Sequence, residues 1–293
     1  MSKTSANAST RRIAFQGAPG AYSDLACRQV YPELATLACD GFEDAMAAVR
    51  EERAALAMLP IENSVAGRVA DIHHLMPRSG LHIIGEHFQR VNHHLLALPG
   101  ASLETIKVVR SHVHALSQCR NFIRSRGLKV VVAADTAGAA AEVKERGDPT
   151  IAAIASELAG QIYGLQSLKQ SIEDEGHNTT RFLVMAREPL HVPNDGSAVV
   201  TSFIFRVRNV PASLYKALGG FATNGVNMTK LESYMLGGRF TATQFYADVE
   251  GHPEARPLAL ALDELRFFSR EVRILGTYPA HPFRIEAAKA DAD

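Results

Sequence analysis

Short apolar runs alternate with amphipathic stretches over the first two thirds of the chain. Runs such as 13–15, 56–59 and 107–110 are compact and apolar, as in buried strands, whereas the stretches between them carry apolar residues at helical spacing. This alternation is typical of βαβ units arranged around mainly parallel sheets. The expected strands are 13–15, 56–59, 82–86, 93–98, 107–110, 129–133, 150–155 and 181–186, and the expected helices are 24–30, 42–52, 69–75, 115–126, 138–146 and 156–163.

A different pattern follows residues 188–197, where Pro, Asn, Asp, Gly and Ser residues interrupt the apolar runs. Beyond this linker the expected order is strand 199–207, helix 213–223, strands 228–234 and 241–250, helix 255–268 and strand 272–277. This order is the ferredoxin-like βαββαβ arrangement. We therefore expect an α/β protein with one domain at 12–188 and a second at 198–280. The first should have two lobes, about 12–89 plus 172–188 and 90–170.

Composition narrows the class of protein. The 293 residues are 46% hydrophobic and 21% charged with a formal net charge of zero, which argues against a nucleic-acid partner bound through phosphates. No apolar run approaches the roughly 20 residues of a membrane helix, and residues 1–12 lack the apolar segment of a signal peptide. We expect a cytoplasmic protein. The cysteines, Cys27, Cys39 and Cys119, are expected to be reduced thiols because they are odd in number and lack Cys-x-x-Cys spacing.

Three polar clusters stand directly beside apolar runs. They are residues 60–64 (Pro-Ile-Glu-Asn-Ser), 111–119 (Ser-His-Val-His-Ala-Leu-Ser-Gln-Cys) and 178–182 (Asn-Thr-Thr-Arg-Phe). Hydroxyl, amide and carboxylate groups would thus gather where buried strands end, which is how α/β proteins build small-molecule sites. The turn at 17–23 matches neither phosphate-binding glycine pattern, so it is no nucleotide loop.

The same residues also have purely structural interpretations. Glu62 can be a surface acid, Ser64 a helix cap, and Thr180 a residue chosen for its β-propensity. Ser111 is expected at a helix start, where it can cap the helix, bind a carboxylate or do both. Gln118 lies seven residues on, about two turns along the same expected helix face.

Histidine pairs occur at His73-His74, His93-His94 and His112/His114. Adjacent histidines on a strand or helix point in different directions, and no His-Glu-x-x-His or His-plus-Cys ligand spacing is present. No metal site is expected.

The three clusters, in this order and ahead of residues 224–233 (Asn-Gly-Val-Asn-Met-Thr-Lys-Leu-Glu-Ser), resemble the prephenate dehydratase family. These are enzymes of phenylalanine biosynthesis with an attached ACT regulatory domain, and the resemblance runs from about Arg12 to Pro279. It implies a two-lobed catalytic domain like type 2 periplasmic binding proteins, followed by a ferredoxin-like ACT domain. It also implies a cofactor-free carbon–oxygen lyase that acts on prephenate and forms a homodimer or homotetramer.

The resemblance assigns roles to individual residues. Thr180 is expected to be catalytic, as a hydrogen-bond donor to the hydroxide that leaves when prephenate loses CO2 and water. Arg181 is expected to hold the pyruvyl carboxylate or to brace its loop, and Phe182 to pack in the core more than to stack on the substrate. The residues expected to bind substrate are Glu62, Asn63, Ser64, Ser111, Gln118, Asn178, Arg181 and Phe182.

The C-terminal stretch implies control by L-phenylalanine at a subunit interface. The candidate effector residues are Ala212, Ser213, Leu214, Asn224, Gly225, Val226, Asn227, Leu231, Glu232 and Ser233. The chain departs from the family twice: Ala212-Ser213-Leu214 replaces Gly-Ala-Leu, and Glu232-Ser233-Tyr234-Met235 replaces Glu-Ser-Arg-Pro. Two alternatives stay open, namely arogenate dehydratase and a non-catalytic amino-acid sensor. The sequence contains neither a DNA-binding helix pair nor a basic patch, either of which would favour the sensor.

Overall fold

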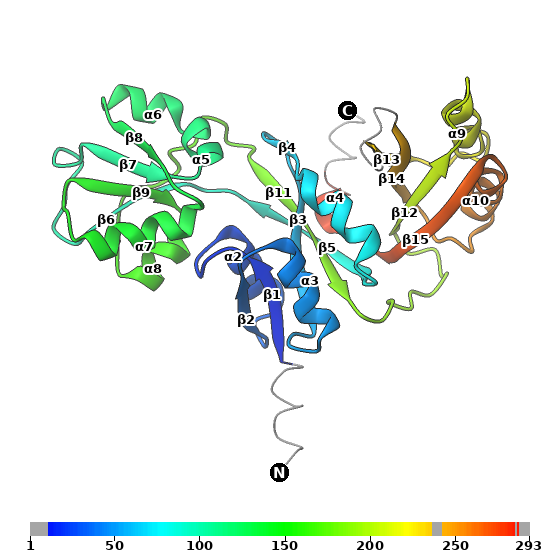
Figure 1. The fold of residues 1–293 in the computed structure, drawn as a ribbon, viewed down its shortest axis with the longest axis horizontal. Helices are drawn as coiled ribbons and strands as arrows, with labels where there is room; N and C mark the ends of the chain where they lie inside the picture. Colours follow the sequence, from blue (N-terminus) through cyan, green and yellow to red (C-terminus); the bar gives the residue numbers. More distant parts are fainter. Residues whose placement is uncertain (1–10, 236–241, 285, 287–293) are drawn as a thin grey trace, which may run out of the picture. The chain divides into compact units, whose positions relative to one another are not determined.

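The computed structural model describes residues 11–235, 242–284 and 286. Its contacts divide the chain into two compact units, Met1–Val69 with His87–Phe182, and Ala70–Glu86 with Leu183–Asp293. The strands fall into three sheets, which together confirm the expected mixed α/β class (Figure 1). Among the described residues, no helix is long and apolar enough to cross a membrane.

The first sheet has the strand order β2-β1-β3-β11-β5, with β4 paired to β3. Strand β1 pairs in parallel with β2 and β3, and its central residues Ile13, Ala14 and Phe15 are buried because helices pack against it. The strands are β1 Arg12–Gln16, β2 Ala35–Cys39, β3 Leu56–Asn63, β4 Gly67–Arg68, β5 His82–Arg90 and β11 Thr179–Ala186. The helices of this part of the sequence are α2 Tyr22–Val30, α3 Phe42–Arg50, α4 Ala70–Leu75 and the 3-10 turn η1 Met76–Arg78.

The second sheet has the order β10-β6-β9-β7-β8. Strand β7 is parallel to β8 and β9, whereas β6 is antiparallel to β9 and β10. Small and aliphatic residues of β9 and α7 fill the core, as Ala152, Ile154 and Val143 are fully buried. The strands are β6 His94–Ala97, β7 Val108–Ser111, β8 Lys129–Val132, β9 Ile151–Ala155 and β10 Gln166–Lys169, and the helices are α5 Val113–Gln118, α6 Arg120–Ser125, α7 Thr136–Arg146 and α8 Glu157–Tyr163.

A close backbone approach joins the β1–α2 turn to helix α8 in the first unit. Ser156 Oγ donates to the Gly20 carbonyl at 2.5 Å, and it also accepts from Ala159 N as the cap of α8. A Cβ atom at Gly20 would lie 2.7 Å from Ala159 Cα, and the φ of Gly20 is +91°, so only glycine fits there. The Gly20 N–H donates to the buried carboxylate of Asp24, so this backbone donor is already occupied within the turn.

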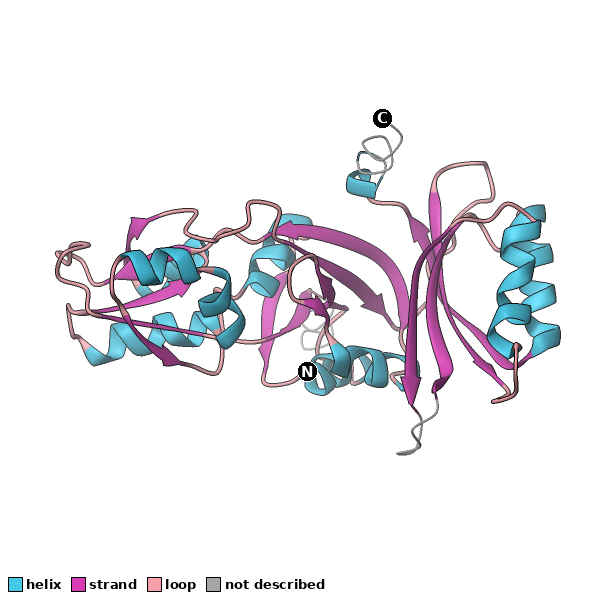
Figure 2. Cartoon of the chain, turned by 90° about the horizontal axis from the view of Figure 1, so that it is seen from above, coloured by secondary structure: helices cyan, strands magenta, loops and turns pink. Residues whose placement is uncertain are grey.

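The third sheet is antiparallel with the order β13-β14-β12-β15, which confirms the expected ferredoxin-like module. Both of its helices cover one face of the sheet (Figure 2). Phe203, Phe205, Phe221 and Leu262 form part of the core between the sheet and the helices. The elements are β12 Val199–Val207, α9 Ser213–Thr223, β13 Met228–Met235, β14 Ala242–Glu250, α10 Arg256–Phe268 and β15 Ser269–Pro279. Residue 241, expected to open β14, lies outside the described residues.

Several element boundaries differ from expectation. The strand expected at 56–59 continues to Asn63, because Ile61 is fully buried and Glu62 and Asn63 pair with β4. The single helix expected at 115–126 is broken at Cys119, whose backbone (φ −116°, ψ 27°) is not helical. Strands β2, β4 and β10 are additional to those expected, and each is short or a partly exposed edge strand. The three cysteines, expected to be reduced thiols, are free, and all three are buried.

Candidate active site

Asn63 and Thr180 meet where the end of β3 lies beside the start of β11. Ser64 N donates to the Thr179 carbonyl at 2.9 Å, which holds the two strand ends together. From this position Asn63 Nδ2 donates to Thr180 Oγ1 at 2.9 Å and to Asn178 Oδ1 at 2.7 Å. Two of the three sequence clusters are therefore brought to one point.

The orientation of the Asn63 amide follows from its backbone neighbours. Its Oδ1 accepts from Val65 N at 3.0 Å and from Ala66 N at 2.8 Å. Backbone N–H groups can only donate, so the oxygen has to face them and the NH2 group has to face Thr180. Thr180 Oγ1 is thus an acceptor from Asn63, and within the described ranges no group accepts the proton of its own hydroxyl. That proton is available to a ligand.

The third cluster joins through Gln118. Asn178 Nδ2 donates to Gln118 Oε1 at 2.9 Å, and the same oxygen lies 3.0 Å from His93 Nε2. On its other side, His93 Nδ1 lies 3.0 Å from the hydroxyl of Tyr22. Burial lowers the pKa of His93 and raises the pKa of Tyr22 well above its usual value, so both groups are neutral near pH 7.

Ser64 ties the strand ends together from the outside. Its hydroxyl donates to the His177 carbonyl at 2.9 Å and accepts from Thr179 N at 2.9 Å. It caps no helix, because residues 65 and 66 form a turn into β4. Both hydrogen bonds hold the 177–180 segment in place beside Asn63.

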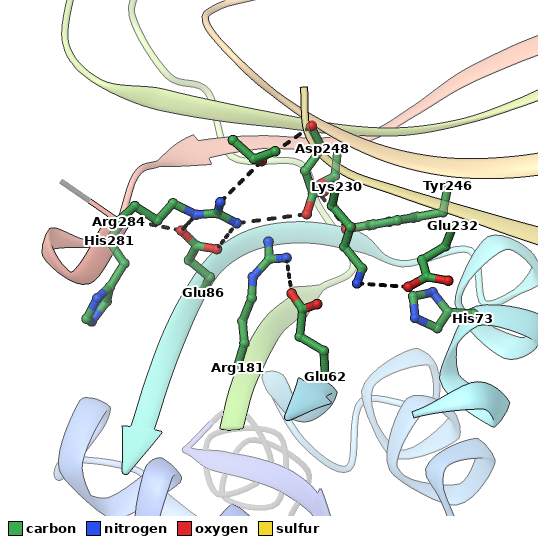
Figure 3. A network of polar contacts seen from close by, with 12 residues as sticks. Glu62, His73, Glu86, Arg181, Lys230, Glu232, Tyr246, Asp248, His281 and Arg284 are labelled. Carbon is green, nitrogen blue, oxygen red and sulfur yellow. Dashed lines mark hydrogen bonds and ion pairs between the residues drawn. The ribbon is translucent and has the colours of Figure 1, made fainter. Parts of the chain in front are cut away.

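Arg181 and Glu62 form an ion pair next to this point, with Nη1 2.9 Å from Oε1 (Figure 3). The Arg181 side chain is 3% exposed and that of Glu62 is 32% exposed, so the carboxylate reaches water and the guanidinium does not. Of the two roles expected for Arg181, this contact fits bracing of the strand ends. Phe182 is 1% exposed and packs in the core.

Ser111 does not lie at a helix start, so the expected cap is wrong. It is the last residue of β7, fully buried, and its hydroxyl donates to the Ile154 carbonyl at 2.6 Å. The cap of α5 is His112, whose Nδ1 accepts from His114 N at 3.4 Å. Because Ser111 precedes the helix, the expected two-turn spacing to Gln118 on one helix face is wrong as well.

A cavity of about 420 Å³ adjoins the cluster in the first unit. Gln118 and Asn178 line it, together with two arginines of α6, Arg120 and Arg124, which sequence reasoning missed. Their i, i+4 spacing on one helix was the available signal. The remaining lining residues are Val65, Ser117, Asn121, Glu173, Asp174 and Glu175. In the part of the chain that the structure describes, no group of histidine, cysteine or acidic residues has the arrangement of a metal site.

The candidate effector residues lie at different places in the second unit. Ala212 is the N-cap of α9 and Asn224 its C-cap, so Ala212–Leu214 and Asn224–Asn227 are separated by a helix about 16 Å long. The Asn224-Gly225 turn closes α9 in the expected way, with Gly225 at φ +66° and Val226 N donating to the Phe221 carbonyl. Leu231, Glu232 and Ser233 lie on β13. One protomer does not gather all of them around one amino acid.

Tyr234, one of the departures from the family, is 4% exposed. Its hydroxyl lies 2.8 Å from His73 Nδ1 of α4, and the two rings are 5.4 Å apart. In the same unit Arg284 forms a two-pronged ion pair with the buried carboxylate of Glu86, at 2.6 and 2.9 Å (Figure 3).

The structure brings hydroxyl, amide and carboxylate groups from distant segments of an α/β fold to one point. Such a site is typical of an enzyme that acts on a small molecule. The chain belongs to the prephenate dehydratase family, whose model, described as "Prephenate dehydratase", matches residues 13–190. It is therefore a member of a family of carbon–oxygen lyases.

Two relatives and one solved structure show how far this similarity extends. The chain is 57% identical over 274 residues to a bifunctional N-acyl-homoserine lactone acylase/prephenate dehydratase of Komagataeibacter europaeus, covering 94% of this chain and 98% of that protein. It is 40% identical over 282 residues to arogenate dehydratase/prephenate dehydratase 1 of Arabidopsis thaliana, covering 92% and 72%. The prephenate dehydratase of Arthrobacter aurescens in complex with L-Phe superimposes with a TM-score of 0.83 at 31% identity, covering 96% of each chain.

These similarities confirm the fold class expected from the sequence. Prephenate dehydratases are among the structural relatives, and the third sheet is consistent with a small C-terminal domain.

Proposed function

We propose that this chain converts prephenate to phenylpyruvate, with Thr180 as the catalytic residue. The observation that carries the proposal is the direction of the hydrogen bond from Asn63 Nδ2 to Thr180 Oγ1. Because the threonine oxygen accepts from Asn63, its own O–H is left to donate to a substrate oxygen. A half-buried hydroxyl with a fixed donor role is the group that this dehydration needs.

The reaction breaks two bonds, and the enzyme has to assist the breaking of the ring C–O bond. The bond from the ring to its carboxylate breaks and releases CO2, and the electron pair completes the aromatic ring. The ring C–O bond breaks as its oxygen leaves with a pair of electrons as hydroxide. Thr180 O–H stabilises the negative charge that grows on this oxygen, and water supplies the proton that completes the product water.

The neighbouring groups fit substrate binding and bracing. Gln118 Oε1 faces Asn178 and His93, so its NH2 group points elsewhere, and no described residue accepts from it. That NH2 group suits a carboxylate of the substrate, and Arg120 and Arg124 supply positive charge in the same cavity. Of the three acidic residues that also line it, Glu173 and Asp174 accept from backbone N–H groups, and Glu175 adds a negative charge. Arg181 and Glu62 would brace Thr180, and Ser64 would hold the 177–180 segment. Strong binding of the departing ring carboxylate is not expected, because it would stabilise the ground state.

The experiment is an assay of the purified chain with prephenate, read by the absorbance of phenylpyruvate. Thr180→Val, which replaces the hydroxyl by a methyl group of similar size, should lower kcat by at least about 100-fold. Thr180→Ser keeps the donor and should retain substantial activity. A Thr180→Val enzyme with wild-type kcat would remove Thr180 from the chemistry. Measuring kcat/KM for arogenate beside prephenate tests the alternative substrate, which differs only in bearing an amino group instead of a keto oxygen.

Regulation by L-phenylalanine at the C-terminal domain is part of the same proposal. It is supported by the L-Phe complex of the Arthrobacter aurescens relative and by the Asn224–Asn227 turn, which is retained here. The separation of Ala212 from Asn224 within one protomer favours an effector site shared by two subunits, and hence a homodimer or homotetramer. The proposed domains are 12–188 for catalysis and 198–280 for regulation. Calorimetry with L-phenylalanine and inhibition assays on the full chain test this, and the absence of both binding and inhibition would exclude it.

A second candidate activity is amide hydrolysis of N-acyl-homoserine lactones. It is favoured by the 57% identity to the bifunctional relative of Komagataeibacter europaeus, which spans nearly all of that protein. Incubation with an N-acyl-homoserine lactone should release free homoserine lactone and the fatty acid. If Thr180→Val loses dehydratase activity but keeps this hydrolysis, the two reactions use different residues.

A further inference from the structure

His93 is held from three sides in the first unit, directly before β6. Its side chain is 2% exposed. Its backbone N–H donates to Glu173 Oε2 at 2.9 Å, its ring meets Tyr22 edge-on at 5.5 Å, and its two ring nitrogens contact Gln118 and Tyr22. A ring held in this way presents its nitrogens in fixed directions.

The proton on His93 can be located by following the hydrogen bonds from Asn63. Asn63 has to turn its NH2 group toward Asn178, because backbone N–H groups occupy its oxygen. Asn178 therefore presents Oδ1 to Asn63 and its NH2 group to Gln118. Gln118 then presents Oε1 to both Asn178 and His93. An oxygen facing His93 Nε2 at 3.0 Å requires that this nitrogen carry the hydrogen.

We propose that His93 is a positioning residue of the dehydratase: its Nε2–H fixes Gln118, and through Gln118 and Asn178 it keeps the Asn63 amide and the Thr180 hydroxyl in their working directions. The inference rests on the proposed role of Thr180. It also fixes the direction of the Gln118 NH2 group, which the proposed function assigns to substrate binding. His93 itself does not contact the reacting atoms.

The hydrogen bond from His93 Nε2 to Gln118 forms in both the neutral and the positively charged ring. In the neutral ring Nδ1 is an acceptor, so the single Tyr22 proton goes to Nδ1 and not to the Asn92 carbonyl, which lies 2.7 Å from the same hydroxyl oxygen. In the charged ring Nδ1–H donates to Tyr22, which then donates to the Asn92 carbonyl, 2.7 Å away. Nε2–H donates to Gln118 in both states. The titratable groups that act on the ring are Glu173 and His94, and Tyr22 contacts it directly.

The chain provides a matched control in the next residue. His94 is also buried, at 3% exposure, but its Nδ1 contacts Ser167 Oγ at 3.0 Å and has no contact with Gln118. His93→Leu and His94→Leu thus remove similar buried rings, and only the first removes the donor to Gln118. His93→Gln places an amide NH2 group near the position of Nε2 and should restore the donor.

The test has a spectroscopic arm and a kinetic arm on the full-length protein. In 15N spectra of histidine-labelled enzyme at pH 7.5, the signal lost in His93→Gln should be that of a neutral ring protonated at Nε2. For folded enzyme, His93→Leu should lower kcat/KM for prephenate at least 10-fold, while His93→Gln and His94→Leu stay within about 3-fold of wild type.

The outcomes separate this inference from the proposed function. A neutral His93 protonated at Nδ1 overturns the inference, whatever the enzyme does. So does a His93→Leu enzyme with wild-type kinetics, or an equal loss in His94→Leu, since then only packing matters. If prephenate is not converted at all, the proposed function fails, and the tautomer measured by NMR still decides whether the hydrogen-bond chain is directed as stated.

Discussion

Asn63 Nδ2 lies 2.9 Å from Thr180 Oγ1, although 117 positions separate the two residues in the sequence. Adjacent strand ends bring them together, and the turn after β3 fixes which of the two is the donor. This hydrogen bond positions Thr180 and, because Thr180 accepts in it, leaves the threonine O–H able to donate to a ligand. Chemistry at this point therefore depends on an amide that need not touch the substrate.

Asn63→Asp should abolish most of the turnover with little change in fold. One carboxylate oxygen can still accept from Val65 N and Ala66 N. The other oxygen would face Thr180 as an acceptor and draw the hydroxyl proton away from the substrate. We expect kcat to fall about 100-fold at pH 7.5, within the range for losing a donor to a developing oxyanion. Steady-state kinetics beside a thermal melt would check this, and an active Asn63→Asp enzyme would mean that Thr180 is not oriented by Asn63.

Glu62 and Arg181 should respond unequally to removal. Glu62→Met leaves a guanidinium that is 3% exposed without this carboxylate, whereas Arg181→Met leaves a carboxylate that already reaches water. We expect Glu62→Met to lower the free energy of unfolding by about 3 kcal/mol and Arg181→Met by less, about 1 to 2 kcal/mol. Urea denaturation of both variants and of the double variant measures the difference. Equal losses would contradict the unequal exposure of the two side chains as the cause, and an additive double variant would show that the pair is not coupled.

The sequence predicted the long elements well because their apolar periodicity reflects burial in a single local environment. It failed where the environment comes from another segment. The strand containing Glu62 and Asn63 extends past Pro60 because Ile61 is buried and β4 folds back onto the strand end. The helix around Cys119 breaks although nothing in its periodicity marks a break. Ser111 was misplaced by one step, since the next residue, His112, is the cap.

The polar clusters were found from the sequence, but their connections were not. Asn63, Gln118 and Asn178 each carry an amide, and no local pattern shows which oxygen faces which nitrogen. No local pattern marks the role of His93, because its partners Tyr22 and Gln118 lie 71 and 25 positions away. Such directed networks depend on backbone geometry that only the folded chain supplies.

Ala212→Gly should stabilise the protein. Ala212 has φ 62° and ψ 8°, a left-handed conformation that glycine adopts without strain. A side chain with a Cβ costs roughly 1 to 2 kcal/mol there, and glycine gives back part of this through the greater entropy of the unfolded chain. The expected gain is about 0.5 to 1 kcal/mol in the free energy of unfolding by urea denaturation. Ala222→Gly, inside the same helix, serves as the control and should destabilise by about 1 kcal/mol.

Acid should destabilise the protein through its buried histidines, and His93 makes this testable. Burial lowers the pKa of His93 in the folded state, so below the unfolded value, about 6.5, the unfolded chain binds a proton that the folded chain does not. This group has no effect on stability well above pH 6.5, and it lowers stability as the pH falls toward its folded pKa. The contribution of this group to the free energy of unfolding changes by at most about 1.4 kcal/mol per pH unit.

His93→Gln cannot take up a proton, so its free energy of unfolding should fall less steeply than that of wild type between pH 7 and 5.5. Urea denaturation across that range compares the two, with His94→Gln as a partner variant because burial lowers the pKa of His94 as well. Identical slopes for wild type and His93→Gln would show that His93 is protonated equally in both states.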